Sequence, residues 1–233
     1  MGLLFNNINS NKLFTYKVMH DGGSAPNPYS ELCTLAICKP AIRRVARVGD
    51  VIVGFGCKSN GDDEHRIVYC MIIDEVLTWD AYISACKMGK YKNRIPTSPN
   101  DPGDCIWSST IQAHDPLDSH SGHDKDDFNN DVKSGENVLI GKKYWYFGNG
   151  ANQYICINEE LPLVGRGHRS TSNDLARREA FEMFFTKALV DRNILAPGKY
   201  GEPKLPPEIG DEVQRQRCRV AQKEDDMHGE EML

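Results

Sequence analysis

This sequence lacks several features that would place a protein in a large functional class at once. Its eight cysteines include no Cys-x-x-Cys pair, and no secretory signal pattern precedes them. We therefore expect reduced, mostly buried thiols in a cytoplasmic protein. No window approaches the roughly 18 uncharged apolar residues that a membrane span requires, so we expect no membrane partner.

Motifs of the common nucleotide-binding and hydrolase folds are also missing. Neither the Gly-x-x-x-x-Gly-Lys-Ser/Thr phosphate loop nor the Gly-x-Gly-x-x-Gly dinucleotide fingerprint occurs. No Gly-x-Ser-x-Gly nucleophile elbow occurs either, and the stretch DGGSAPNP carries its serine outside a strand-elbow-helix context. The net charge is −5, so a nucleic-acid contact would need a local basic pocket rather than a global positive field.

The apolar content is sufficient for a folded core, because 39% of the residues are hydrophobic and 9% are aromatic. Apolar spacing predicts helices at 40–48, at 78–89 and after residue 171. Several short strands with few helices indicate an α+β fold with a mixed, barrel-like sheet. Alternation with aromatic and β-branched content predicts a strand at 12–20. Apolar runs predict further strands at 32–39, 51–57, 67–77 and 104–107, and a strand or kinked pair at 137–148.

The domain organisation follows from the polar segments. We expect a single α+β domain at 12–195, preceded by a flexible leader at 1–11. A long polar loop near 90–135 interrupts the domain, and loops of this length are usually functional or disordered. Residues 196–233 are expected to form a charged, disordered tail, whose acidic end is a candidate docking segment for a protein partner.

A basic, glycine-punctuated loop at 165–169 precedes the clearest helix of the chain. Thr171 and Asp174 have the spacing of a capping box at the start of this helix. The helix carries one apolar stripe, formed by Phe181, Phe184, Phe185, Ala188 and Leu189.

The same loop is a candidate anion site. A helix N-terminus leaves about four backbone N–H groups without partners and carries roughly half a positive charge. Arg166 and Arg169 could grip a phosphate there. The alternative is a solvated loop, whose arginines pair with acidic neighbours while His168 packs against an aromatic strand.

Two further clusters are candidates for chemistry. The aromatic run YWYFG at 144–148, with Trp107 and Tyr16 as potential neighbours, could stack on a nucleobase for about 1–3 kcal/mol per base. Only one face of that strand can line a pocket, and the alternative is plain core. The loop segment HDPLDSHSGHD could hold a metal, or it is simply a solvated loop without a rigid element. The candidate metal ligands are His114, Asp118, His120 and His123.

Several segments, taken in order, resemble the second type of nucleotide-modification-associated domain, a family of domains from bacteria and phages. The resemblance runs from about residue 14 to residue 185, and its segments are FTYKVMHDGGSAPNP, CTLAICKPAIRRVARVGDVIVGFG, GDCIW, VLIGKKYWYFG and GRGHR. The passage VGDVIVGF more loosely resembles the barrel of PUA-like domains such as EVE and ASCH, which hold a base in a pocket. The resemblance implies binding of a nucleotide or nucleic acid within a DNA or nucleotide modification system. It fixes neither a reaction nor a cofactor.

The resemblance also points to particular residues. It implies that Arg166 and Arg169 hold a phosphate, with His168 as the general acid–base candidate of any enzyme, because its ordinary pKa lies near neutrality. A metal-dependent hydrolase and a non-catalytic interaction module are the alternatives. The other implied nucleotide-binding residues are Tyr16 and His20, Asp21 and Asp104 as acceptors from the base, and Trp107 and Tyr146 as stacking partners.

Overall fold

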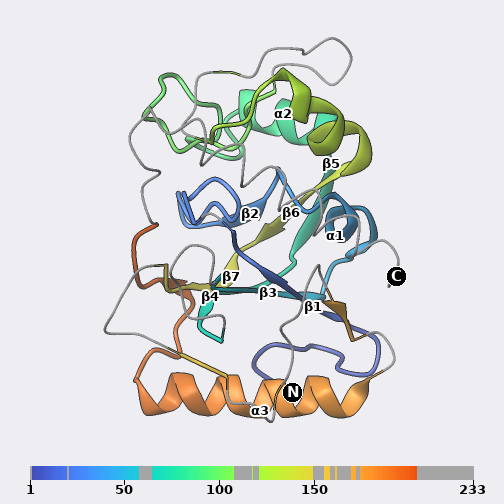
Figure 1. The fold of residues 1–233 in the computed structure, drawn as a ribbon, viewed down its shortest axis with the longest axis vertical. Helices are drawn as coiled ribbons and strands as arrows, with labels where there is room; N and C mark the ends of the chain where they lie inside the picture. The colour runs from blue at the N-terminus through green and yellow to red at the C-terminus, as the bar shows by residue number, and fades with distance from the viewer. Residues whose placement is uncertain are drawn as a thin grey trace.

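The strands of this protein form two open sheets that lie one above the other, with helices outside them (Figure 1). The computed structural model describes residues 2–19, 21–57, 65–107, 117, 121–148, 155–157, 161, 169–171 and 174–203. The α+β class and the mixed strand directions are confirmed, but the strands described do not close into a barrel. No helix in this part of the chain is long and apolar enough to cross a membrane.

The larger sheet, which we call sheet A, has six strands. β1 pairs in parallel with β3, and β7 pairs in parallel with β9, whereas the other neighbours are antiparallel. The order across sheet A is β8 (Arg169–Ser170), β1 (Leu13–Lys17), β3 (Val51–Phe55), β4 (Ile67–Ile72), β7 (Lys143–Tyr146) and β9 (Gly198–Lys199).

The smaller sheet, sheet B, is antiparallel with the order β2 (Cys33–Leu35), β6 (Asn137–Gly141), β5 (Glu75–Thr78). The expected strand at 67–77 divides into β4 and β5, and the expected kinked pair at 137–148 is β6 and β7. Asp74 sits at both divisions, because its carboxylate accepts the backbone N–H groups of Lys142 at 2.5 Å and Lys143 at 3.3 Å. Each of these two segments therefore crosses from one sheet to the other.

The long helix α3 (Leu175–Asp191) covers the outer face of sheet A (Figure 1). The apolar stripe is confirmed, since Phe181, Phe185, Ala188 and Leu189 are buried and Phe184 is partly buried against the same core.

The start of α3 differs in one respect from the predicted capping box of Thr171 and Asp174. Asp174 caps the helix by accepting the Arg177 N–H at 2.9 Å. Thr171 instead accepts the Leu13 N–H at 3.1 Å, and so ties β8 to β1.

A second layer of core lies between the two sheets, and a third covers sheet B. Alternation along β7 divides its aromatic side chains, so Tyr144 and Tyr146 face sheet B while Trp145 and Phe147 pack towards α3. The outer layer contains α2 (Trp79–Lys87), which begins one residue after the start predicted at 78, and a π-helical turn, η3 (Asn129–Ser134). The short helix α1 (Pro40–Val45) starts at Pro40, as predicted.

Three segments differ from their expected form. Leu4 and Phe5, within the expected flexible leader, are buried under α3, where the Glu182 carboxylate accepts the N–H groups of residues 3–5. Residues 104–107 form no strand; they are a buried irregular segment whose Cys105 N–H bonds to the Arg94 carbonyl. Residues 198–199, within the expected tail, add β9 to sheet A, and residues 204–233 lie outside the described part.

Candidate functional site

Three of the residues expected to bind a nucleotide lie together in the core between the sheets. The Tyr146 hydroxyl donates to the Asp21 carboxylate, and the Tyr16 and Tyr69 hydroxyls lie 2.9 Å apart. Burial raises the pKa of both Tyr146 and Tyr16, and the charge of Asp21 raises it further. These hydroxyls are therefore neutral, and their hydrogen bonds join strands of sheet A to each other and to the segment after β1.

Asp104 lies at the centre of a separate buried network. One carboxylate oxygen accepts the Thr34 hydroxyl, and the other accepts the Tyr82 hydroxyl at 2.6 Å. The Arg94 guanidinium lies 3.8 Å from the same carboxylate and also donates to Thr34 at 2.8 Å. Asp104 is 0% exposed, so its oxygens are used within the protein.

Trp107 is equally buried, with 0% of its surface exposed. Its ring meets Phe128 edge-on at 5.2 Å, and its Nε1–H donates to Asp131 at 3.2 Å. Its ring therefore packs within the core, and its indole N–H is used by Asp131.

The basic loop lies mostly outside the described residues. Arg166 and His168 are in the omitted part, as is His20, and Arg169 is described only through its backbone. That backbone pairs with Thr15 in β1, so the loop ends beside the strand that carries Tyr16.

The metal candidates His114, Asp118 and His120 are also outside the described part. Within it, no group of three metal-binding side chains is found.

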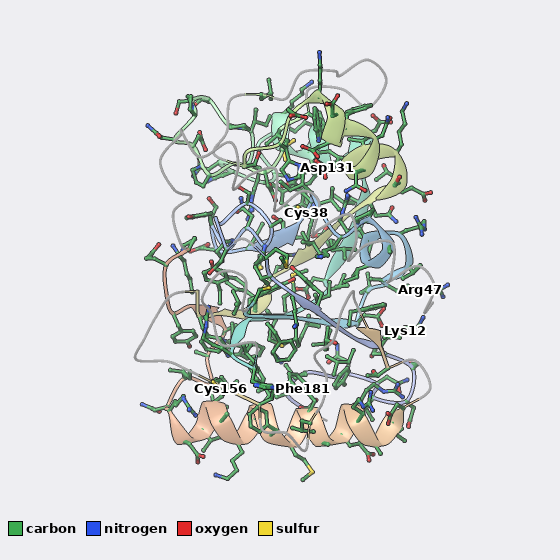
Figure 2. All side chains as sticks on the ribbon, in the orientation of Figure 1. Lys12, Cys38, Arg47, Asp131, Cys156 and Phe181 are labelled. Carbon is green, nitrogen blue, oxygen red and sulfur yellow. The ribbon has the colours of Figure 1, made fainter. Side chains whose placement is uncertain are left out.

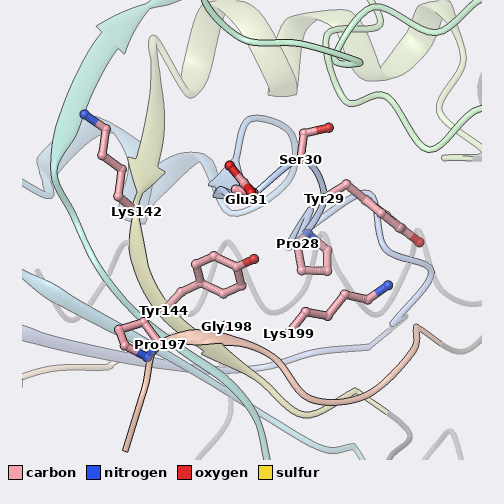
Figure 3. Close-up of a pocket in the computed structure, with 9 residues that line it drawn as sticks. All are labelled: Pro28, Tyr29, Ser30, Glu31, Lys142, Tyr144, Pro197, Gly198 and Lys199. Carbon is pink, nitrogen blue, oxygen red and sulfur yellow. The ribbon is translucent and has the colours of Figure 1, made fainter.

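An open cleft of about 520 Å³ lies between the segment before β2 and the strands β7 and β9 (Figure 3). The Tyr144 side chain extends into it from β7, and Lys199 extends from β9 towards Tyr29. Its lining residues are Pro28, Tyr29, Ser30, Glu31, Lys142, Tyr144, Pro197, Gly198 and Lys199.

Two lysines and two tyrosines give this cleft its chemical character. The Lys199 ammonium lies 4.6 Å from the centre of the Tyr29 ring and 2.5 Å from Glu202. Lys142 is 3.4 Å from Glu75, and both ion pairs reach solvent. Burial raises the pKa of Tyr144 to about 12, so its hydroxyl is protonated at neutral pH and can donate a hydrogen bond.

A second constellation, which sequence reasoning missed, joins Cys38, His123 and Asp131. The Cys38 sulfur is 3.4 Å from His123 Nε2, and His123 Nδ1 is 2.7 Å from Asp131 Oδ2. We call these three residues the Cys38 triad. Figure 2 shows Cys38 and Asp131 on the sheet-B side of the molecule, away from Phe181 on α3.

The turn that presents Cys38 connects β2 to α1. Cys38 and Lys39 both have left-handed backbone angles, with φ of 60° and 45°, and such angles cost non-glycine residues about 1–3 kcal/mol each. The structure holds this turn from both sides of Cys38. Its N–H donates to Asp131 Oδ1 at 2.9 Å, and its carbonyl accepts Arg43 Nε at 2.6 Å.

Arg43 also fixes the position of Asp131. Its guanidinium is fully buried and donates to the Asp131 carbonyl at 2.7 Å and to the Asn137 carbonyl at 2.8 Å. Gly135 is required beside it, because a Cβ atom there would lie 2.0 Å from Arg43 Nη2. The Trp79 indole donates to the Asp131 carbonyl as well, at 2.8 Å.

The family model of nucleotide modification associated domain 2 matches residues 10–204. The chain belongs to this family. No curated protein and no solved structure matches it.

The matched range of the nucleotide modification associated domain contains both the cleft and the Cys38 triad. The two sites share no residue, and they lie at opposite ends of the segment from Pro28 to Cys38 that contains β2. The domain is associated with nucleotide modification, as its resemblance implied.

Proposed function

We propose that this domain binds a nucleotide or a modified nucleobase in the cleft beside β7, as part of a DNA modification system. The observation that carries the proposal is the combination of two aromatic side chains and two lysines around one open cleft. Tyr144 and Tyr29 provide aromatic surface for a base, and Lys142 and Lys199 provide positive charge for a phosphate. The association of the family with nucleotide modification supports this assignment.

The dimensions and energies of the cleft are compatible with such a ligand. Sites for small molecules typically measure about 300–1,000 Å³, and the cleft has about 520 Å³. The lysines now pair with Glu75 and Glu202, but exposed ion pairs contribute only about 0–1 kcal/mol. A phosphate can therefore displace either carboxylate at little cost.

We propose that two residues expected from the sequence to bind a nucleotide, Asp21 and Tyr146, support the wall of this cleft. Tyr146 follows Tyr144 by two positions and lies on the same face of β7. Asp21 accepts a hydrogen bond from the Tyr146 hydroxyl. Burial and the charge of Glu202 raise the pKa of Tyr29 most, and the charge of Asp21 raises it further. We propose that Asp21 and Tyr146 orient the aromatic side of the cleft rather than touch the ligand.

The basic loop remains our proposal for a second phosphate contact. Arg166 and Arg169, with His168 as an acid–base group, would act from the side of β8, whose backbone is bonded to β1. As part of the same proposal, the domain holds the base in a pocket, as PUA-like domains do.

Calorimetry and thermal shift with a panel of nucleoside monophosphates test the cleft. A ligand that binds only the folded state raises the unfolding temperature. We expect Tyr29→Leu to weaken affinity by about 10-fold, since base stacking contributes about 1–3 kcal/mol. Lys199→Gln should weaken affinity and reduce its dependence on salt.

A matched control is Lys187→Gln on α3, where Lys187 forms a similar exposed pair with Asp191 at 2.6 Å. This variant should bind as the wild type does. Equal affinity in Tyr29→Leu, Lys199→Gln and Lys187→Gln would rule out the cleft as the binding site.

A further inference from the structure

The Cys38 triad has the connectivity of a nucleophile, a base and an orienting acid. His123 stands between the other two side chains and uses a different ring nitrogen for each, at 3.4 Å to the Cys38 sulfur and 2.7 Å to Asp131. A structural histidine needs no thiol at its second nitrogen. In nucleophilic catalysis by cysteine, a base contacts the sulfur and a third group orients the base, and this is the arrangement here.

Burial decreases along the triad from the acid to the nucleophile. The Asp131 side chain is 0% exposed, whereas that of His123 is 15% exposed and Cys38 is half-buried. Most of the other described cysteines are buried in the core layers. Cys38 and His123 therefore reach solvent together, while their acid is fixed in the interior.

The charges in the triad support the same division of roles. Burial opposes a charge on His123, but the Asp131 carboxylate and the Cys38 sulfur outweigh it, and the pKa of His123 rises well above its ordinary value. Burial likewise opposes the Asp131 charge, yet His123 and Arg43 hold the pKa of this carboxylate below its usual range. These neighbours therefore stabilise the imidazolium that forms when His123 takes up a proton.

The backbone at Cys38 is the third observation. Cys38 stands in a left-handed turn between a strand and a helix, and both of its peptide groups are bonded to residues that support the triad. A strained strand-to-helix turn is the device by which α/β-hydrolases expose a nucleophile. The turn here presents a sulfur in place of a hydroxyl.

We infer that Cys38, His123 and Asp131 form a catalytic site for acyl transfer, which attacks the carbonyl carbon of an amide or an ester. This activity goes beyond ligand binding in the cleft, because the two sites share no residue. Cys38 is the nucleophile and His123 is the acid–base group. Asp131 is a positioning residue that holds the ring of His123.

The reaction proceeds in two halves. His123 takes the thiol proton, the Cys38 sulfur bonds to the carbonyl carbon, and the bond from that carbon to nitrogen or oxygen breaks. The departing amine or alcohol receives the proton from His123 Nε2. Water then attacks the thioester and gives a proton to His123, after which the carboxylic acid leaves and the sulfur regains its proton.

Alkylation of the folded protein by iodoacetamide tests the nucleophile. An ordinary thiol is only about 1% ionised two pH units below its pKa of about 8.5, so it reacts slowly there. Near that pH we expect Cys38 to react at least about 10-fold faster than exposed Cys156, as read by peptide mass spectrometry. His123→Gln should remove this difference, and Asp131→Asn should reduce it.

A chromogenic acyl donor tests the chemistry. We expect p-nitrophenyl acetate to release one equivalent of nitrophenolate in a burst and to leave one acetyl group on Cys38. Cys38→Ser should abolish both signals, whereas Cys156→Ser should keep them. Turnover of the corresponding p-nitroanilide would identify amides as substrates, and turnover of the ester alone would identify activated acyl donors.

The result that overturns the inference is equally specific. If Cys38 and Cys156 alkylate at the same rate across the pH range, and no acetyl group is found on Cys38, the triad has no nucleophile. If His123→Gln leaves the alkylation rate of Cys38 unchanged, the contact between His123 and Cys38 is purely structural. If circular dichroism shows that His123→Gln does not fold, the comparison of Cys38→Ser with Cys156→Ser still tests whether Cys38 is the nucleophile.

Discussion

Removing the Asp104 carboxylate should destabilise the fold rather than weaken a ligand contact. Asp104 is fully buried, and its oxygens accept the Thr34 and Tyr82 hydroxyls beside the Arg94 guanidinium. Breaking a buried ion pair by removing one partner costs about 3–5 kcal/mol. We therefore expect Asp104→Ala to lower the free energy of unfolding by about 4 kcal/mol.

Two features of the network change this value in opposite directions. Arg94 keeps hydrogen bonds to the carbonyls of Tyr29 at 2.6 Å and Leu32 at 3.1 Å, so its charge is not left bare. The Tyr82 hydroxyl, by contrast, loses its acceptor at 2.6 Å, and an unpaired buried group costs about 1–3 kcal/mol. Asp104→Asn keeps one acceptor oxygen and should cost only about 1–2 kcal/mol.

Urea denaturation monitored by tryptophan fluorescence measures these differences, and calorimetry should give a transition lowered by about 8–16 °C for Asp104→Ala. Asp191→Asn on the surface of α3 is the control, with a change of about 0.5 kcal/mol or less. A loss below about 1 kcal/mol in Asp104→Ala would refute the reasoning. If Asp104→Ala instead lost nucleotide binding and kept full stability, Asp104 would be a ligand contact, as the sequence suggested.

Three further outcomes follow from the packing. Phe185→Ala should cost about 3–5 kcal/mol in denaturation, and Phe184→Ala less, because only Phe185 is fully buried against sheet A; equal losses would contradict the assigned face. Glu182→Gln should speed hydrogen exchange at residues 3–5, whose N–H groups it accepts, while exchange in β3 stays slow. The absorbance of Tyr144 should titrate at high pH, since burial raises the pKa of this residue to about 12. In the unfolded chain the same hydroxyl loses its proton near pH 10. The contribution of Tyr144 to stability is therefore complete below about pH 10 and is lost as the pH rises towards about 12. A normal titration midpoint in the folded protein would argue against that burial.

Local patterns in the sequence predicted the elements whose signals are local. Alternation predicted β1, an apolar run predicted β3, and the Phe181 stripe predicted the buried face of α3. A helix was predicted from residue 78, and the Thr78 side chain caps α2 by accepting the Ala81 N–H at 3.3 Å. These features depend on neighbours within a few positions, so spacing is enough to find them.

The features that sequence failed to predict depend on distant partners. Residues 105–107 are apolar, as in a buried strand, but the Cys105 N–H bonds to the Arg94 carbonyl and not to a neighbouring strand. The division at Asp74 depends on bonds to Lys142 and Lys143, almost seventy positions away.

The candidate site shows the same limit. His123 was noted as a metal ligand, yet its partners are Cys38, 85 positions before it, and Asp131, 8 positions after it. No local pattern in the sequence joins one cysteine among eight to one histidine among seven.

The pairing of β1 with β8 has a consequence for synthesis of the chain on the ribosome. Leu13 bonds to Thr171, which is 158 positions later, so one edge of β1 has no partner until most of the chain has emerged. At about 5–20 residues per second, that wait lasts roughly 10–30 s. Throughout this interval the nascent chain exposes an apolar strand edge, and a nascent-chain chaperone that covers such edges should raise the yield of folded protein.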